Sequence, residues 1–103
     1  HPIFRVPGLT LPELAELAAL GAFFEFTYCT VSPMWLHATM AHTAAAIRSV
    51  GAGRSILSSD CGQPHNPMPH EGLRILAQMC LEHGFSETDI DRMVRRNPAA
   101  MVA

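Results

Sequence analysis

The sequence predicts an α/β fold in which parallel strands are covered by helices. Two short runs rich in apolar residues, 22–28 and 54–59, are typical of strands, and a helical pattern follows each of them. Strands that alternate with helices are usually parallel and are joined by the intervening helix. The chain has 103 residues, of which 49% are hydrophobic and 16% charged, so we expect one well-packed domain over residues 1–103.

The first helix and the first strand have clear boundaries. After an N-terminal loop with two prolines, Thr10 and Glu13 have the spacing of a capping box, in which each side chain bonds the backbone N–H of the other residue. We expect this helix to run to about Leu20 and to end at Gly21. The aromatic run 22–28 then forms the first strand.

Glu25 stands in the middle of this aromatic strand, where an acidic residue is unusual. Side chains alternate along a strand, so Phe24 and Phe26 face one side while Glu25 faces the other. Two interpretations remain open. Glu25 lies in water on an edge strand, or it faces the polar interior of a barrel, where it could contact a substrate or a residue of the site.

The rest of the chain continues the alternation of helix and strand. Ser32 and Pro33 are typical of a helix start, and Gly51 is typical of a helix end. The pattern predicts a helix over 34–50, a strand over 54–59, a helix from residues 70–71 to 82, a helix over 89–96 and a final turn over 99–102.

The chain is organised around residues 54–73, which read RSILSSDCGQPHNPMPHEGL. The strand ends at Asp60, and a loop stiffened by three prolines leads to the next helix. Ligands of α/β folds bind beside the carboxyl ends of the strands, so Asp60 lies where chemistry is usually done. Further groups that can bind a metal or move a proton follow in the same loop and helix start: Cys61, His65, His70 and Glu71.

Charge, hydropathy and cysteine usage argue against several classes of function. The chain has no lysine, seven scattered arginines and a net charge of −2, so we expect no binding to nucleic acid or to an anionic membrane. No apolar run approaches the ~20 residues of a membrane span. The three cysteines lack CxxC spacing and indicate reduced thiols, so we predict a cytoplasmic location. The start at His1–Pro2, without methionine, suggests a processed or cleaved chain.

Three stretches of the sequence are distinctive in combination: LSSD at 57–60, GQPHNPMPHEG at 62–72 and DIDRMVRRNPA at 89–99. Together with the long helix between the last two, they resemble the last part of the amidohydrolase-like metal-dependent hydrolases, and most of all an uncharacterised branch of that group. Proteins of this kind are (β/α)8 barrels. The resemblance therefore implies that the chain is the carboxyl-terminal portion of a TIM-type barrel, roughly its last third.

The resemblance also implies roles for two residues. Asp60 matches the acid at the end of the eighth strand, which binds metal or takes the proton from the attacking water. His1 matches a histidine at the end of an earlier strand that often binds metal. The implied activity is metal-dependent hydrolysis of a small amide, lactone or related carbonyl compound, with zinc, or else manganese or iron, as the divalent metal. The HxH motif of such enzymes would precede His1, so we expect the chain alone to be inactive.

Other interpretations of these residues stay open. Asp60 could be a turn acid, and His65 and His70 could be ligands, substrate contacts or solvent-facing residues. His37 and His42 lie on the predicted helix about 140° apart, so we interpret them as surface or packing residues. A non-catalytic interaction or assembly domain derived from a barrel is the alternative function.

Two strands alone do not make a stable sheet, so the predicted elements leave apolar surface that needs a cover. This surface includes Phe23, Phe24, Phe26 and the region 76–79. We expect either a homo-oligomer or the remainder of the same barrel to cover it. The other expected partner is a small-molecule substrate.

Overall fold

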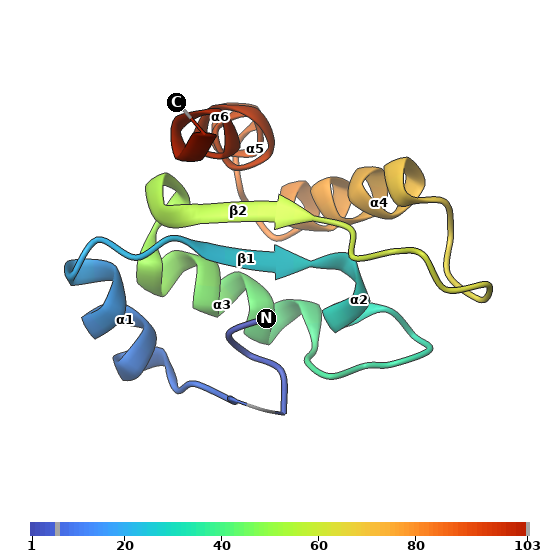
Figure 1. Cartoon of the computed structure of the whole chain (residues 1–103), viewed down its shortest axis with the longest axis horizontal. Coiled ribbons are helices and arrows are strands. Elements are labelled where there is room, and N and C mark those ends of the chain that lie inside the picture. The colour runs from blue at the N-terminus through green and yellow to red at the C-terminus, as the bar shows by residue number, and fades with distance from the viewer. Residues whose placement is uncertain (6, 103) are drawn as a thin grey trace.

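A two-stranded parallel sheet forms the centre of the structure, a computed structural model that describes residues 1–5 and 7–102 (Figure 1). Strand β1, Phe24–Thr27, pairs with β2, Ser55–Ser58. Helix α3, Met40–Val50, lies between the two strands in the sequence and makes the crossover that a parallel pair requires. The prediction that these strands are parallel neighbours is confirmed.

Helices surround this sheet. Besides α3 they are α1 Leu11–Ala19, the short α2 Tyr28–Val31, α4 Pro69–Glu82, α5 Glu87–Asp91 and α6 Asn97–Val102, with a 3₁₀ turn η1 at Ala52–Arg54 and a π-helical turn η2 at Arg92–Arg96. Figure 1 shows α1 and α3 on the β1 side and α4, α5 and α6 on the β2 side. Within residues 1–5 and 7–102, no helix is long and apolar enough to cross a membrane.

The predicted fold class, the carboxyl-terminal portion of a TIM-type barrel, is wrong. The described residues form an α-rich domain whose sheet has two strands of four residues each. The strands are shorter than predicted because the chain enters the helical turn α2 directly after Thr27 and leaves the turn η1 only at Ser55. A barrel needs staggered strands that pair along both edges until the sheet closes. In the described part of the chain, each strand pairs along one edge only.

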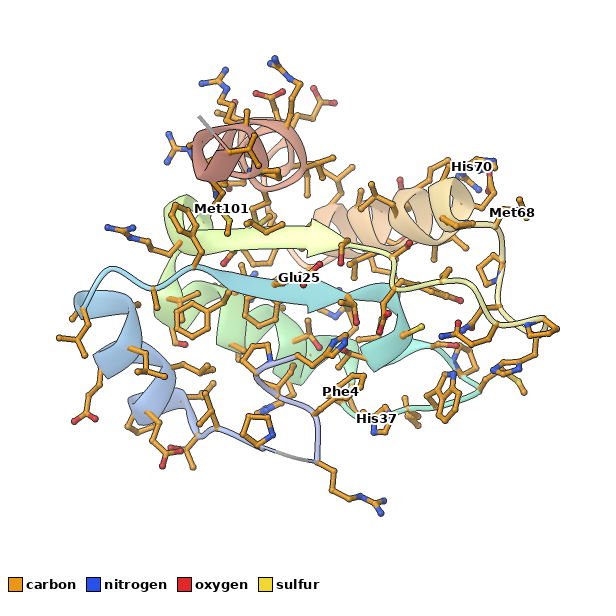
Figure 2. The ribbon with its side chains drawn as sticks, viewed as in Figure 1. Phe4, Glu25, His37, Met68, His70 and Met101 are labelled. Carbon is orange, nitrogen blue, oxygen red and sulfur yellow. The ribbon has the colours of Figure 1, made fainter. Side chains whose placement is uncertain are left out.

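The sheet has one covered face and one open face. Phe24, Phe26 and Leu57 lie in the hydrophobic core with Ile47 of α3. Glu25, between the two phenylalanines, is exposed on the opposite face (Figure 2). This position fits the interpretation in which Glu25 lies in water, and the barrel interior proposed as the alternative does not form in the described residues.

Helix α3 begins at Met40, not at residue 34 as the sequence pattern predicts. Thr39 is its cap, because the Thr39 Oγ1 accepts a hydrogen bond from the His42 N–H at 3.1 Å. The preceding loop, residues 32–39, instead turns at Leu36, whose φ of 41° is left-handed. The correction moves His37 from a helix face into this loop. The capping box of Thr10 and Glu13 at the start of α1, by contrast, is confirmed.

Two positions fix helices close to the ends of β2. The buried Asn97 donates from Nδ2 to the carbonyl oxygens of Ala52 at 2.7 Å and Ser55 at 2.6 Å, which fastens the carboxyl-terminal helices to the start of the strand. At the other end, Gly72 lets α4 pack on the residues after β2. A Cβ at Gly72 would lie only 2.6 Å from the Cys61 Sγ.

Candidate functional site

Four segments meet beyond the carboxyl ends of β1 and β2. They are the N-terminal residues 1–5, the turn α2, the loop 32–39 and the loop 59–68. Between them lies a half-open cavity of about 170 Å³ lined by Phe4, Cys29, Trp35, His37, Asp60 and Gln63. Figure 2 shows Phe4 and His37 next to each other on this side of the molecule. We call this space the strand-end cavity.

Asp60 and His1, both predicted as site residues, lie together at the strand-end cavity. The His1 Nε2 is 3.1 Å from the Asp60 Oδ2, and the two side chains are 38% and 44% exposed. The other ring nitrogen, Nδ1, is 3.4 Å from the Thr27 Oγ1, which in turn is 3.0 Å from the Thr30 Oγ1. The imidazole is thus oriented through both nitrogens, while enough of the carboxylate remains exposed to meet a ligand.

A row of rings forms one wall of the site. The His1 and Phe4 rings stack with centroids 4.2 Å apart, and the Phe4 and His37 rings stack at 4.1 Å. The Trp35 ring is nearly parallel to His37, at 12°, but its centroid is 6.0 Å away. Trp35 also meets His65 at 5.6 Å in a tilted arrangement. We call this row, from His1 to His65, the aromatic ladder.

Cys29 anchors the loop after β2 through its thiol. Its thiol donates to the Asp60 carbonyl oxygen at 2.8 Å and accepts from the Asn66 Nδ2 at 3.3 Å. Burial, followed by the nearby charge of Asp60 and the neighbouring Cys61, raises the pKa of the Cys29 thiol to about 11. The Cys29 thiol is therefore protonated at neutral pH, whereas the nucleophilic form of a cysteine is the thiolate.

Gln63 completes this anchor. Its Oε1 accepts from the Asn66 Nδ2 at 2.7 Å, and its Nε2 donates to the Asp60 carbonyl oxygen at 3.3 Å. The loop also bonds the opposite side of the cavity, since Ser32 Oγ and Asn66 Oδ1 are 3.2 Å apart. Asp60 is therefore held by its backbone while its carboxylate faces the cavity.

Two residues of this site have backbone conformations that residues other than glycine rarely adopt. Asp60 has a φ of 53° and Leu36, between Trp35 and His37, has a φ of 41°. Among the described residues, these two are the non-glycine positions with left-handed φ. Such conformations cost about 1–3 kcal/mol each and concentrate at functional sites. Their common location strengthens the assignment of the strand-end cavity as the functional site.

The structure separates the remaining predicted residues from this pair. His65 reaches the site through its contact with Trp35, whereas His70 lies at the start of α4, 4.0 Å from its neighbour Glu71 (Figure 2). Glu71 pairs with Arg74 at 2.8 Å, and that contact lowers the pKa of the Glu71 carboxyl. Glu25 lines separate hollows on the open face of the sheet.

Sequence reasoning missed the aromatic wall of the site. Phe4 and Trp35 were not considered, and His37 was interpreted as a surface or packing residue on a helix. The signal was present at Thr39, a good N-cap immediately before the alanine-rich stretch. A helix start at residue 40 would have placed Trp35 and His37 in a loop after a strand, where functional side chains concentrate.

A divalent metal would find part of a binding site here. The imidazole nitrogen of His1 and the carboxylate oxygen of Asp60 are both suitable donors, and their 3.1 Å separation allows both to bind one ion. Within residues 1–5 and 7–102, no group of three or more His, Cys, Asp or Glu side chains is arranged to hold an ion. The pair therefore supplies two donors, whereas catalytic zinc usually has three protein ligands.

Comparison of the chain with protein-family models, curated proteins and solved structures returned no match.

Proposed function

We propose that the strand-end cavity is part of the active site of a metal-dependent hydrolase that acts on a small amide, lactone or related carbonyl compound. The proposal rests on the sequence resemblance to the amidohydrolase-like hydrolases and on one observation of the structure. The two residues that the resemblance singles out, His1 and Asp60, lie 59 positions apart yet meet at 3.1 Å beside the cavity.

Asp60 has the chemistry of a general base in this arrangement. Its Oδ2 faces the His1 imidazole, and no hydrogen bond to Oδ1 is present among the described residues. The carboxylate can accept a proton from an attacking water while the imidazole, held by Thr27, keeps it in place. General-base catalysis of this kind contributes about 10²–10⁴ to a reaction rate.

His1 and Asp60 would hold the metal, with zinc the first choice and manganese or iron the alternatives. Such an ion, when bound, would lower the pKa of water to near 7 and polarise the carbonyl of the substrate. A third protein ligand to the metal would have to come from a residue other than His1 and Asp60. We therefore expect activity only where such a ligand completes the site.

The test is Asp60→Asn in the full-length protein, with Glu16→Gln as a matched control on the exposed side of α1. We expect hydrolysis to fall at least about 10²-fold in Asp60→Asn and to stay unchanged in the control. Asparagine keeps the shape of aspartate and tolerates a left-handed φ, so the melting temperature should hardly move. Full activity of Asp60→Asn would refute the proposal.

A non-catalytic interaction domain remains the second candidate, and the open face of the sheet favours it. Apolar side chains of Phe23, Ile56, Pro98, Met101 and Val102 line a hollow of about 420 Å³ there. Met101 and Val102 are 57% and 88% exposed, which is unusual for apolar side chains that cluster. Light scattering of the purified chain over a range of concentrations would show whether this face self-associates, and a monomer throughout would leave the enzyme as the better candidate.

A further inference from the structure

We propose that the strand-end cavity binds a single planar aromatic ring that carries a hydrogen-bond donor, with the ring against the aromatic ladder and the donor on Asp60. This inference names a substrate class for the site described above and so builds on the proposed hydrolase. It rests on three observations: the size of the cavity, the wider spacing of ring centroids at one step of the ladder, and the carboxylate among the residues that line the cavity.

The size of the cavity fits one ring. Its volume of about 170 Å³ is close to the ~150 Å³ of an apolar cavity that is known to take up benzene. It is smaller than the ~300–1,000 Å³ of pockets that enclose drug-sized ligands. A two-ring system or a long acyl chain would therefore have to extend beyond the cavity.

The aromatic ladder is closely packed except at one step. The His1–Phe4 and Phe4–His37 pairs are 4.2 and 4.1 Å apart, so neither pair can admit another group. The Trp35 and His37 rings are nearly parallel, at 12°, but their centroids are 6.0 Å apart. A ring held between two others needs about 7 Å, which is two van der Waals contacts of ~3.5 Å. A ring would therefore enter at this step only if Trp35 moves away from His37.

The loop that carries this step is able to open. Trp35 is 48% exposed and its neighbours Met34 and Leu36 are 62% and 60% exposed, so few packing contacts resist a small shift of Trp35. His37 is fixed from the other side by its stack on Phe4. A flat ligand would therefore move Trp35 and leave the ladder below it in place.

The Asp60 carboxylate gives the cavity a strong hydrogen-bond acceptor. Asp60 supplies a carboxylate, and the Cys29 thiol cannot donate to a ligand because its hydrogen is already directed at the Asp60 carbonyl oxygen. Among the residues that the structure describes, neither lysine nor arginine lines the cavity. A ligand with N–H or O–H groups would pair with Asp60, whereas a ligand carboxylate would be repelled by it.

Trp35 is the single tryptophan of the chain, so its fluorescence reports directly on this cavity. Three probes separate the elements of the inference. Benzamide has the ring and the donor, cyclohexanecarboxamide has the donor without a flat ring, and benzoate has the ring with a negative charge. For a fragment of this size we expect benzamide to change the emission with a dissociation constant of about 1–10 mM, and the other two to bind at least about tenfold more weakly.

Variants locate the binding. His37→Ala removes one wall and should weaken benzamide at least about tenfold, while His42→Ala, an exposed histidine at the start of α3, should bind like the parent. Asp60→Asn should remove the preference for benzamide over benzoate without loss of the fold, which circular dichroism would verify. Equal binding of benzamide and cyclohexanecarboxamide, or no saturable change up to about 50 mM benzamide, would overturn the proposal.

The test of the ring site is independent of the test of the proposed hydrolase, because the benzamide titration measures binding and not turnover. Benzamide binding without any hydrolytic activity would support the ring site and count against the enzyme. Hydrolysis of aliphatic amides or lactones together with no binding of benzamide would support the enzyme and refute the ring site.

Discussion

Replacement of Gly72 with alanine should destabilise this protein, although the same change in an open helix position usually stabilises one. The new Cβ would lie 2.6 Å from the Cys61 Sγ, 3.3 Å from the Tyr28 Cδ1 and 3.4 Å from the Ser59 Cβ. Carbon atoms prefer about 3.5–4.0 Å, so the first contact is roughly 1 Å too short.

The magnitude follows from two opposing effects. Overpacking of a buried position costs about 1–3 kcal/mol, and the higher helix propensity of alanine offsets about 1 kcal/mol of it. We expect the free energy of unfolding of Gly72→Ala to fall by about 1 kcal/mol, as a lower urea midpoint with an unchanged m-value. Gly62→Ala is the control, because a Cβ there meets no atom within 4 Å.

A double-mutant cycle identifies the atom responsible. Since the Cys61 Sγ makes the shortest contact, Gly72→Ala in a Cys61→Ala background should be neutral or stabilising by up to about 1 kcal/mol. The reasoning is refuted if Gly72→Ala stabilises the parent protein, or if its cost is the same in both backgrounds. The first result would mean that α4 does not pack on the residues after β2 as closely as the structure has it.

Three further predictions concern stability and reactivity. Asn97→Ala should lower the free energy of unfolding by about 1–3 kcal/mol, because it removes the two hydrogen bonds from the Asn97 Nδ2 to the carbonyl oxygens of Ala52 and Ser55, and urea denaturation would measure the loss. Hydrogen bonds from Arg95 and Arg96 lower the pKa of the Asp91 carboxyl below its ordinary 3.8, so the ionised Asp91 stabilises the fold above pH 3.8 and loses this effect as the pH falls through the lowered pKa. The difference in the free energy of unfolding between the parent and Asp91→Asn should therefore vanish in acid. A similar difference at pH 6 and pH 2 would contradict this prediction. The half-buried Cys61 should react with iodoacetamide at pH 7.5 before Cys29 does, because Cys29 is buried and its pKa is about 11. Mass spectrometry of the labelled peptides would show the order of reaction. Labelling of Cys29 first would contradict this prediction.

The sequence was sufficient to predict the two strands and their pairing, because each strand has a distinct apolar run and a helix-length connection follows β1. It did not predict how short the strands are. Thr27 and Tyr28 continue the β-favouring composition of the strand, yet the chain turns helical at Tyr28, where Ser32 N–H bonds to the Tyr28 carbonyl oxygen at 2.9 Å. Local propensity cannot reveal this turn, since the hydrogen bond of the buried Cys29 to the distant Asp60 favours it.

The same limit explains why the fold class was wrong. The residue pattern carries information about short stretches such as LSSD at 57–60, where the structure has the end of β2 and the start of the loop. Their combination into a barrel depends on strand neighbours, and in the described residues the outer edges of β1 and β2 have none. The residue pattern therefore predicted this strand correctly, whereas the barrel that the resemblance implies is wrong.

The candidate site could be predicted as far as its charged groups and no further. Asp60 was predictable because a strand pattern ends at a carboxylate, and its partner His1 came only from the resemblance. The aromatic wall is different in kind, because Phe4, Trp35 and His37 come from two loops with no periodic pattern and meet only through the fold. What places them is the strained turn at Leu36 together with the cap at Thr39. The substrate preference proposed for the site therefore depends on the part of the molecule that the sequence specifies least directly, and the conformation of loop 32–39 decides it.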